Sequence, residues 1–282
     1  MKKYNKFDLL NYNSYRIKAI AENAYLPENT DDILNLLSSL ENYYLIGNGS
    51  NIILSKPIYE EDFIIIRENL SNIDVSNNEI YVESGAILKD VADIARENEL
   101  SGMEMFYDIP GTIGGAVVMN AGACGEAISD LIEDVFFVDI QTRKMGKVKK
   151  DELKWGYRKS EFQNGEKIIT GASLKLKKGN KLDIIKKTAE IIEKRHSMQP
   201  WDMPSAGSVF KRPEGHYVGK MVEELGLKGY RIGGMKISEK HAGFIVNCGN
   251  GTGEDVLKIV DFVKAKVKEK YNITLELEQI II

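Results

Sequence analysis

The chain has 282 residues, of which 43% are hydrophobic and 28% are charged, and its formal net charge is −4. This length allows two domains, and the composition is that of a soluble globular protein. Lysines and arginines are scattered apart from short runs such as 147–150. Because the basic residues are scattered, we expect no nucleic-acid partner. No stretch approaches the roughly 20 apolar residues that a membrane span needs, so we expect no membrane partner.

The residue types that bind metals or form disulfides are few. The sequence contains two cysteines, Cys124 and Cys248, three histidines and no C-x-x-C pair. A zinc cluster or a disulfide framework is therefore poorly supported, and we predict no bound metal. The first residues also lack the apolar core of a secretion signal. We expect a cytoplasmic protein that is a monomer or a weak oligomer.

In the first third of the chain, helical and extended patterns alternate. Thr30 has the side chain of a helix N-cap, and apolar residues then recur at helical spacing, namely Ile33, Leu36, Leu37 and Leu40. Residues 43–46, 52–54, 62–67 and 79–83 predict short strands. Residues 86–98 predict a helix with one apolar stripe.

The strands at 43–46 and 52–54 are joined by a small polar loop, Gly47-Asn48-Gly49-Ser50-Asn51. Strand, Asn-Gly turn and strand is the usual signature of a hairpin, and on local grounds we favour that interpretation. The alternative is a nest of backbone N–H groups and polar side chains that holds a pyrophosphate. The Rossmann fingerprint does not fit, because Ile52 stands where its third glycine belongs and a strand follows instead of a helix.

Residues 108–125 are dense in small side chains, and we expect the protein to be organised around them. The small residues are Gly111, Gly114, Gly115, Ala116, Ala121, Gly122, Ala123 and Gly125. Because glycine costs about 1 kcal/mol relative to alanine inside a helix, we predict that this run does not form an ordinary core helix. It suits a backbone that closely approaches a flat, charged ligand. The alternative is a tight corner where two layers of chain pack backbone to backbone.

The middle of the chain predicts a strand at 134–140, its hairpin return at 142–148 and a further strand at 167–176. Between them, Arg158 lies among aromatic residues at 153–162. A surface loop with a snorkelling arginine and an arginine presented to an anionic substrate are equally compatible with this pattern. Residues 182–194 then predict a helix with a broad apolar face, formed by Ile184, Ile185, Ala189, Ile191 and Ile192.

Pro200 marks a break, and we place a domain boundary near it. Residues 204–213 form a proline-bounded turn that exposes Ser208, although most serines in such turns only cap backbone groups. A short helix at 221–225, a strand at 241–247 and an amphipathic helix at 254–271 follow, the last with Val256, Val260, Val263 and Val267 facing inward. Alternation in 274–280 places Glu276 and Glu278 on one strand face, where carboxylates are usually solubility groups.

Taken together, these segments resemble the UDP-N-acetylenolpyruvoylglucosamine reductase (MurB) family over nearly the whole chain, in one consistent order. The segments that carry the resemblance are Tyr15-Arg16-Ile17, Gly47 to Asn51, Ile109-Pro110-Gly111-Thr112-Ile113-Gly114-Gly115-Ala116, Asn120-Ala121-Gly122-Ala123, Tyr157-Arg158-Lys159-Ser160, Ser205 to Lys211, Leu227 to Gly234, His241 to Asn247 and the final strand with Glu278. Each segment is weak alone, and together in register they are a strong signal. No inserted tyrosine loop follows Arg158, so the chain resembles the shorter subtype.

The resemblance implies an α+β fold with two domains. Residues 1–198 would form an FAD-binding domain of the PCMH/vanillyl-alcohol-oxidase type, with two subdomains divided near residue 75, and residues 199–282 a smaller α+β substrate domain. The implied activity belongs to bacterial peptidoglycan synthesis. Hydride would pass from NADPH to FAD and then to UDP-N-acetylglucosamine enolpyruvate, which would give UDP-N-acetylmuramate.

The resemblance also implies residue roles. Ser208 would donate a proton, and Arg158 and Glu278 would stabilise the enol-type intermediate. Tyr157, Lys211, Arg212 and His241 would lie near the UDP-sugar. The residues implied to hold FAD are Gly47, Asn48, Gly49, Ser50, Asn51, Pro110, Gly111, Thr112, Gly114, Gly115, Ala116, Asn120, Ala121, Gly122 and Ala123.

These residue types suit the implied chemistry. Adding hydride to a double bond beside a carboxylate builds negative charge on that carboxylate, and arginine is permanently cationic and forks onto carboxylates. Serine is a poor acid in water, so Ser208 can serve only if its rigid turn positions it. A protonated carboxyl group at Glu278 could donate a hydrogen bond to the forming enol.

Three positions depart from the family's usual pattern: Asp108 stands where glycine is common, Lys18-Ala19 replaces Gly-Gly, and Arg212 replaces asparagine. The first two concern flavin contacts and the third concerns substrate contacts.

Two other functions fit parts of the chain. A flavin oxidase or dehydrogenase of the same superfamily would explain the glycine-rich loops but not the C-terminal segments. A non-catalytic nucleotide-sugar or flavin-binding protein would not explain why Arg158, Ser208 and Glu278 are retained.

Overall fold

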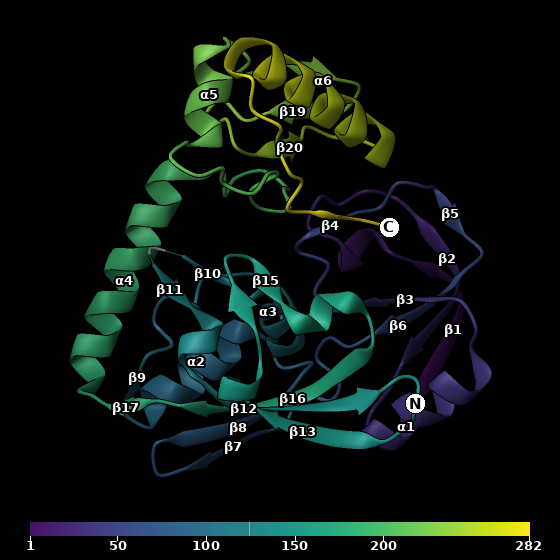
Figure 1. The fold of residues 1–282 in the computed structure, drawn as a ribbon, viewed down its shortest axis with the longest axis vertical. Coiled ribbons are helices and arrows are strands. Elements are labelled where there is room, and N and C mark those ends of the chain that lie inside the picture. The colour runs from purple at the N-terminus through teal and green to yellow at the C-terminus, as the bar shows by residue number, and fades with distance from the viewer. Residues whose placement is uncertain (124) are drawn as a thin grey trace. The chain divides into compact units, whose positions relative to one another are not determined.

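The computed structural model describes residues 1–123 and 125–282, and these residues form two compact units. The first unit comprises residues 1–4, 24–48 and 62–193, and the second comprises residues 5–23, 49–61 and 194–282 (Figure 1). Each unit therefore combines segments that are distant in sequence. Cys124 lies outside the described residues, and Cys248 is a free cysteine.

An antiparallel five-stranded sheet is the centre of the first unit. Its strand order is β13-β12-β16-β8-β7. The bounds are β7 Ile73–Ser76, β8 Glu79–Glu83, β12 Ile132–Asp139, β13 Met145–Lys149 and β16 Lys167–Lys175. The predicted strands at 79–83, 134–140 and 167–176 and the hairpin return are confirmed.

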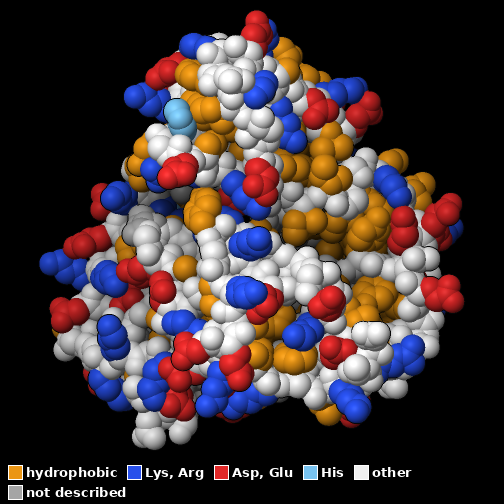
Figure 2. Space-filling model, in the orientation of Figure 1, with side chains coloured by type: hydrophobic (Ala, Val, Ile, Leu, Met, Phe, Trp, Pro, Cys, Tyr) orange, Lys and Arg blue, Asp and Glu red, His pale blue; other side chains and the backbone are white. Residues whose placement is uncertain are grey.

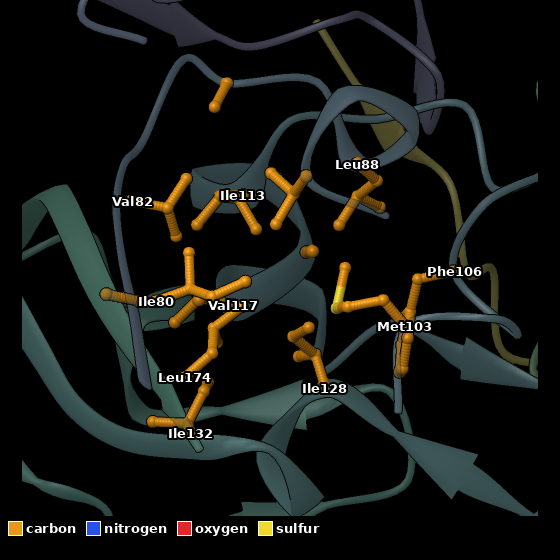
Figure 3. Close-up of a cluster of buried hydrophobic side chains, with 14 of the residues drawn as sticks. Ile80, Val82, Leu88, Met103, Phe106, Ile113, Val117, Ile128, Ile132 and Leu174 are labelled. Atoms are coloured by element: carbon orange, nitrogen blue, oxygen red, sulfur yellow. The ribbon is translucent and has the colours of Figure 1, made fainter. Parts of the chain in front are cut away.

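Two helices cover this sheet, α2 (Leu88–Glu97) and α3 (Ile113–Met119). Figure 3 shows Ile113 and Val117 of α3 among Ile80, Val82 and Leu174 of the sheet, within one buried apolar cluster. Burying an aliphatic side chain of this kind contributes about 1.5–3 kcal/mol.

The expectation that residues 108–125 form no ordinary core helix is wrong, because α3 lies inside this run and packs in the core. Three of its residues, Ile113, Ala116 and Val117, are buried. The Thr112 side chain caps its N-terminus by accepting a hydrogen bond from Gly115 N, at 3.3 Å. Tertiary packing and the cap therefore outweigh the low helix propensity of Gly114 and Gly115.

A second sheet has the strand order β1-β2-β6-β3, with β5 also paired to β2. The bounds are β1 Lys2–Asp8, β2 Ile20–Leu26, β3 Tyr43–Ile46, β5 Ile58–Tyr59 and β6 Asp62–Ile65. β6 pairs in parallel with β3 and with residues 24 and 25 of β2 in the first unit, whereas β5 pairs in parallel with residues 20 and 21 of β2 in the second.

The hairpin interpretation of residues 43–54 is wrong. β3 pairs with β6, and the second predicted strand, β4 (Ile52–Ile53), pairs in parallel with β21 (Ile280–Ile281). The loop at 47–51 therefore connects two different sheets. Helix α1 (Thr30–Ser39) has the predicted buried face, but its N-cap is Asn29, whose side chain accepts a hydrogen bond from Asp32 N.

Residues 194–198 of helix α4 (Lys181–Met198) are assigned to the second unit, and the rest of the helix ends the first unit. The broad apolar face predicted for it is wrong, because only Ile184 and Thr188 are buried and Ile185 is 42% exposed. Positions 184 and 188 lie on one stripe of a helix, so α4 packs along a narrow line. The remaining short strands of this unit are β9 Leu100–Ser101, β10 Gly122–Ala123, β11 Glu126–Ala127, β14 Trp155–Gly156, β15 Lys159–Ser160 and β17 Lys177–Lys178.

The second unit contains a three-stranded antiparallel sheet and two helices. The sheet is β18 (Arg231–Ile232), β19 (Met235–Ile237) and β20 (Ile245–Asn247), and the helices are α5 (Val218–Glu224) and α6 (Gly253–Tyr271). The four valines predicted to face inward on α6 are all buried, so that prediction is confirmed. Thr252 and Asp255 form a capping box at the start of α6.

Lysine, arginine and acidic side chains are interspersed over the face seen in Figure 2. Within residues 1–123 and 125–282, no helix has the length and apolar character that crossing a bilayer requires. The same residues contain no group of three or more histidine, cysteine or carboxylate side chains placed to hold a metal ion.

We predict that Gly253→Ala destabilises the second unit. An added Cβ at Gly253 would lie 1.8 Å from the backbone oxygen of Leu54, so the start of α6 must move away from residue 54. Overpacking of this kind costs about 1–3 kcal/mol in the free energy of unfolding, measured by urea titration. Glu254→Ala is the control, since it removes only an exposed ion pair with Lys258. Equal stability of the two variants would contradict this account of Gly253.

Candidate active site

Two of the small-residue loops meet within the first unit. An added Cβ at Gly47, at the end of β3, would lie 2.6 Å from Thr112 Oγ1 in the glycine-rich segment. A side chain at position 47 would therefore separate the two loops. Asn48 follows in the same unit and is half-buried. The contact brings together residues that lie far apart in sequence and that the resemblance assigns to one ligand.

The first part of the glycine-rich segment is bound to the strand end before α2. Gly114 N donates to Ser84 O at 2.8 Å, and Leu88 N donates to Gly111 O at 3.0 Å. An added Cβ at Gly114 would lie 3.0 Å from Ser84 Cβ, so packing alone explains this glycine. The backbone-to-backbone corner is thus the correct interpretation at position 114.

Gly115 has different surroundings. It is exposed, and the nearest atom to an added Cβ is Thr112 Oγ1, at 3.6 Å, an ordinary contact distance. No neighbouring atom of the protein therefore requires glycine at position 115. Pro110 is also exposed, and Gly111 is half-buried. This side of the segment presents bare backbone, which is the feature that a ligand-binding interpretation needs.

The second part of the glycine-rich segment continues past α3. Asn120 has the left-handed φ of 43°, and its side chain donates to Gly156 O at 2.9 Å. Ala121 N donates to the Ala116 carbonyl at 2.8 Å. Gly122 and Ala123 form β10, and an added Cβ at Gly122 would lie 2.0 Å from Glu126 O of β11. These residues are held by the protein's own backbone.

Arg158 lies in the two-residue turn between β14 and β15, with a left-handed φ of 54°. Its guanidinium donates to Gly122 O through Nη2, and it lies 5.2 Å from the centroid of the Tyr157 ring, which is 60% exposed. Ser160 Oγ donates to Val118 O at 2.7 Å. The hairpin is therefore fastened to the glycine-rich segment, and Arg158 does not belong to a loose surface loop.

The rest of the polar loop belongs to the second unit. Gly49 has a φ of 67°, and an added Cβ would lie 1.9 Å from Tyr12 O. Asn51 donates through Nδ2 to Glu278 O at 3.1 Å and accepts at its backbone oxygen from Ile280 N at 2.9 Å. Ser50 between them is half-buried. Gly49 and Asn51 thus hold the N-terminal and final segments of this unit together.

Ser208 and Glu278 are brought together by their backbones. Phe210 bridges Leu277, and Glu278 N donates to Val209 O at 2.9 Å. On the other edge of the same segment, Ser208 bridges Phe244. The turn predicted to expose Ser208 is an extended segment between two neighbours, preceded by Gly207 with a φ of 77°. Ser208 itself is half-buried.

The residues expected near the UDP-sugar are spread over both units. Tyr157 lies in the first, and Lys211, Arg212 and His241 lie in the second. Lys211 pairs with Glu276 across the extended segments, so Glu276 is not merely a solubility group. The Arg212 guanidinium lies 3.7 Å from the centroid of the Tyr217 ring.

His241 is set up as a neutral imidazole. Burial lowers its pKa below the ordinary value, which favours the uncharged form at neutral pH. Its Nδ1 accepts a hydrogen bond from Gly243 N at 3.1 Å, so Nε2 carries the proton and can donate.

Sequence reasoning missed Asn247 and Gln279, two buried residues that carry amide side chains and bind the segment just before Ser208. Asn247 N donates to Pro204 O at 2.8 Å, and Gln279 Nε2 donates to Ala206 O at 3.0 Å. One signal could have found Gln279. Alternation places it in register with Leu275 and Leu277 on the inward face of the final segment, where a polar residue needs a partner.

Known proteins match this chain over nearly its whole length. The model of the UDP-N-acetylenolpyruvoylglucosamine reductase C-terminal domain matches residues 199–282, and an FAD binding domain model matches residues 22–149. The UDP-N-acetylenolpyruvoylglucosamine reductase of Francisella tularensis is 40% identical over 96% of this chain and 97% of the relative. That of Thermotoga maritima is 41% identical over 95% of this chain and 94% of the relative.

A solved structure gives the same result. The reductase of this name (MurB) from Thermus caldophilus superposes with a TM-score of 0.82 at 31% identity, covering 99% of this chain and 98% of that one. The predicted α+β fold class is confirmed. On the strength of these full-length matches, the chain belongs to the UDP-N-acetylenolpyruvoylglucosamine reductase family.

Proposed function

We propose that this chain performs its family's reaction with Arg158, Ser208 and Glu278 as the groups that meet the reacting part of the substrate. The chain is a flavin-dependent oxidoreductase of peptidoglycan synthesis that converts UDP-N-acetylglucosamine enolpyruvate to UDP-N-acetylmuramate, with NADPH as reductant. Bound FAD supplies the hydride-transfer chemistry between NADPH and the enolpyruvyl double bond. The observation that carries the residue assignment is the hydrogen bond from Arg158 to Gly122, within the segment proposed to bind FAD.

The residues of the first unit fit a dinucleotide. Gly47 meets Thr112, and Gly115 offers an exposed backbone with no side chain above it. We propose that these residues, with Asn48, Pro110, Gly111 and the remaining residues of the glycine-rich segment, hold FAD. Gly49, Ser50 and Asn51 complete the assignment, and the contacts of Gly49 and Asn51 suggest that they also act by shaping the second unit.

Arg158 suits charge stabilisation. Its guanidinium is held by Gly122 O, and its planar fork of N–H donors matches the geometry of a carboxylate. A cation fixed in advance stabilises charge that develops on the substrate's carboxylate without reorganising during the reaction. The left-handed turn at this residue is consistent with a demand for a fixed orientation.

Ser208 and Glu278 suit the proton-handling side of the reaction. We propose that the Ser208 hydroxyl donates a proton to the substrate carbon beside the carboxylate and that the Glu278 carboxyl group stabilises the enol. Adjacent backbone hydrogen bonds fix the two residues relative to each other. That fixed geometry is what a weak acid such as serine needs.

Binding of the UDP-sugar is assigned to Tyr157, Lys211, Arg212 and His241. The exposed Tyr157 ring offers a stacking surface, and neutral His241 offers a donor. We also propose a domain division at 198/199, a monomer or weak oligomer, and a cytoplasmic setting, where NADPH and nucleotide sugars are made. No nucleic acid or membrane partner is required.

The full-length family matches do not support a flavin oxidase or dehydrogenase acting on another small molecule. Substrate screening of the reduced protein separates that activity from the proposed one, because only the proposed function requires oxidation by the enolpyruvyl sugar. A purely flavin- or sugar-binding protein would be colourless or would hold flavin that NADPH does not bleach.

Alanine substitutions at Gly114 and Gly115 distinguish glycines needed for packing from glycines needed for ligand binding. Gly114→Ala crowds Ser84 and should lower the stability of the FAD-free protein. Gly115→Ala meets no such obstacle, so it should leave that stability unchanged or raise it by up to about 1 kcal/mol, yet weaken FAD retention. Thermal unfolding and flavin released on gel filtration measure the two effects. Normal FAD affinity in Gly115→Ala would remove that residue from the cofactor site.

Ser208→Ala should leave bleaching of the flavin by NADPH fast and slow its reoxidation by the enolpyruvyl substrate. The expected loss is about 10²–10⁴-fold, the usual contribution of a positioned acid. Rapid-mixing absorbance follows both half-reactions. If both stay fast, the proton comes from another group.

Arg158→Ala should slow the same reoxidation step by about 10²–10³-fold, the range seen when one stabilising donor is lost. Because the guanidinium also holds Gly122, Arg158→Lys is the matched variant that retains the charge. The lysine variant should recover part of the rate. Loss of flavin with normal reoxidation of the remaining holoenzyme would contradict a role in charge stabilisation.

A further inference from the structure

A buried hydrogen-bond chain leads from the N-terminal Tyr15-Arg16-Ile17 segment to the residues just before Ser208. The Tyr15 hydroxyl donates to Gln279 Oε1 at 3.0 Å. Gln279 Nε2 donates in turn to Ala206 O at 3.0 Å and to Gly207 O at 3.3 Å. Tyr15 is fully buried and Gln279 is 3% exposed. All of these residues belong to the second unit.

The hydrogen bonds through Gln279 can run in only one donor-to-acceptor direction. Turning the Gln279 amide over would place its oxygen against two carbonyl oxygens, which repel it and leave them without a donor. With Nε2 on the carbonyls, Oε1 must accept, and the Tyr15 hydroxyl is the donor beside it. Burial raises the pKa of Tyr15, so the phenol keeps its proton over the working pH range.

The carbonyl groups that accept from Gln279 belong to Ala206 and Gly207, which lie just before Ser208 in the sequence. Gly207 has a left-handed φ of 77° and immediately precedes Ser208, so the direction of its peptide group affects where the Ser208 side chain points. The Gln279 side chain therefore contacts the backbone just before Ser208, and Gln279 is itself the residue next to Glu278 in the sequence.

Tyr15 is itself held by a second buried amide. Asn247 Nδ2 donates to Tyr15 O at 2.8 Å, and Asn247 N donates to Pro204 O at 2.8 Å. The Asn247 side-chain oxygen accepts from Gly249 N and Gly251 N, so this amide also has a fixed orientation. The segment before Ser208 is thus held at residue 204 as well as at residues 206 and 207.

We propose that Tyr15 and Gln279 are positioning residues that hold the Ser208 segment in the orientation needed for proton transfer. The proposal rests on the proposed role of Ser208. It also assigns a task to Tyr15 in the Tyr15-Arg16-Ile17 segment, to which the proposed function gives no other role.

The first test compares Tyr15→Phe and Gln279→Leu in the holoenzyme. Both should slow flavin reoxidation by the enolpyruvyl substrate about 10- to 100-fold, the range expected when a reacting group loses alignment, and leave reduction by NADPH unchanged. Tyr59→Phe is the matched control, because Tyr59 is an equally buried tyrosine whose hydroxyl donates to Ile282 O at 2.7 Å. An equal slowing in Tyr59→Phe would reduce the effect to general destabilisation and overturn the proposal.

Gln279→Glu adds a readout that a merely structural role would not move. A protonated carboxyl group can donate to the residue 206 and 207 carbonyls and accept from Tyr15, whereas a carboxylate repels those carbonyls. Tyr15 and the neighbouring Glu278 are the titratable groups beside this position. The reoxidation rate of this variant, relative to the unchanged protein, should therefore fall as pH rises. A pH-independent ratio would contradict the proposed donation.

The outcomes distinguish this proposal from the function it rests on. In a Ser208→Ala background, Tyr15→Phe should have no further effect, because the positioned group is absent. If Ser208→Ala does not slow reoxidation, the proposed role of Ser208 as proton donor fails. Hydrogen exchange over residues 204–211 still tests the positioning, and it should be faster in Tyr15→Phe and Gln279→Leu but not in Tyr59→Phe. If Ser208→Ala is slow and these two variants are not, or if exchange is unchanged, the positioning proposal is wrong.

Discussion

The hydrogen bonds between residues 209–211 and 276–278 are the constraint on which the second unit's chemistry depends. Glu278 N donates to Val209 O, and Lys211 N donates to Glu276 O, both at 2.9 Å. They bring two segments distant in sequence into one short ladder and give Ser208 a fixed neighbour. The pairing is too short to satisfy all the carbonyl groups around it. Buried backbone groups need partners, and the side-chain amides of Asn51 and Gln279 supply them at Glu278 O and Ala206 O.

Much of the fold could be predicted from local patterns, and the failures have physical causes. The inward valines of α6 and the alternating strand β8 follow from periodicity, because each element buries one face. The hairpin at 43–54 failed because β4 pairs with β21 from the far end of the chain, and no local rule describes a partner that remote. α4 failed because several of its apolar residues do not face a neighbour.

The candidate site, like the fold, could be predicted from the sequence only in part. The resemblance supplied every residue given a role in the reaction, but the sequence could not distinguish Gly114, which packs on Ser84, from Gly115, which meets almost nothing. Nor could it show that Arg158 is fastened to Gly122. These distinctions depend on which atoms of remote residues come near, and composition does not carry that information.

The interleaving of the second unit has a consequence for biosynthesis. Residues 5–23 and 49–61 leave the ribosome before residues 194–282, yet they belong to the same unit. Strand β4 cannot pair with Ile280 and Ile281 until those residues have been translated. Contacts this remote slow folding and leave apolar segments exposed to aggregation in the nascent chain. These two segments can reach their final places only after residues 194–282 have been translated, and residues 199–282 expressed alone would lack the contacts that the two segments supply.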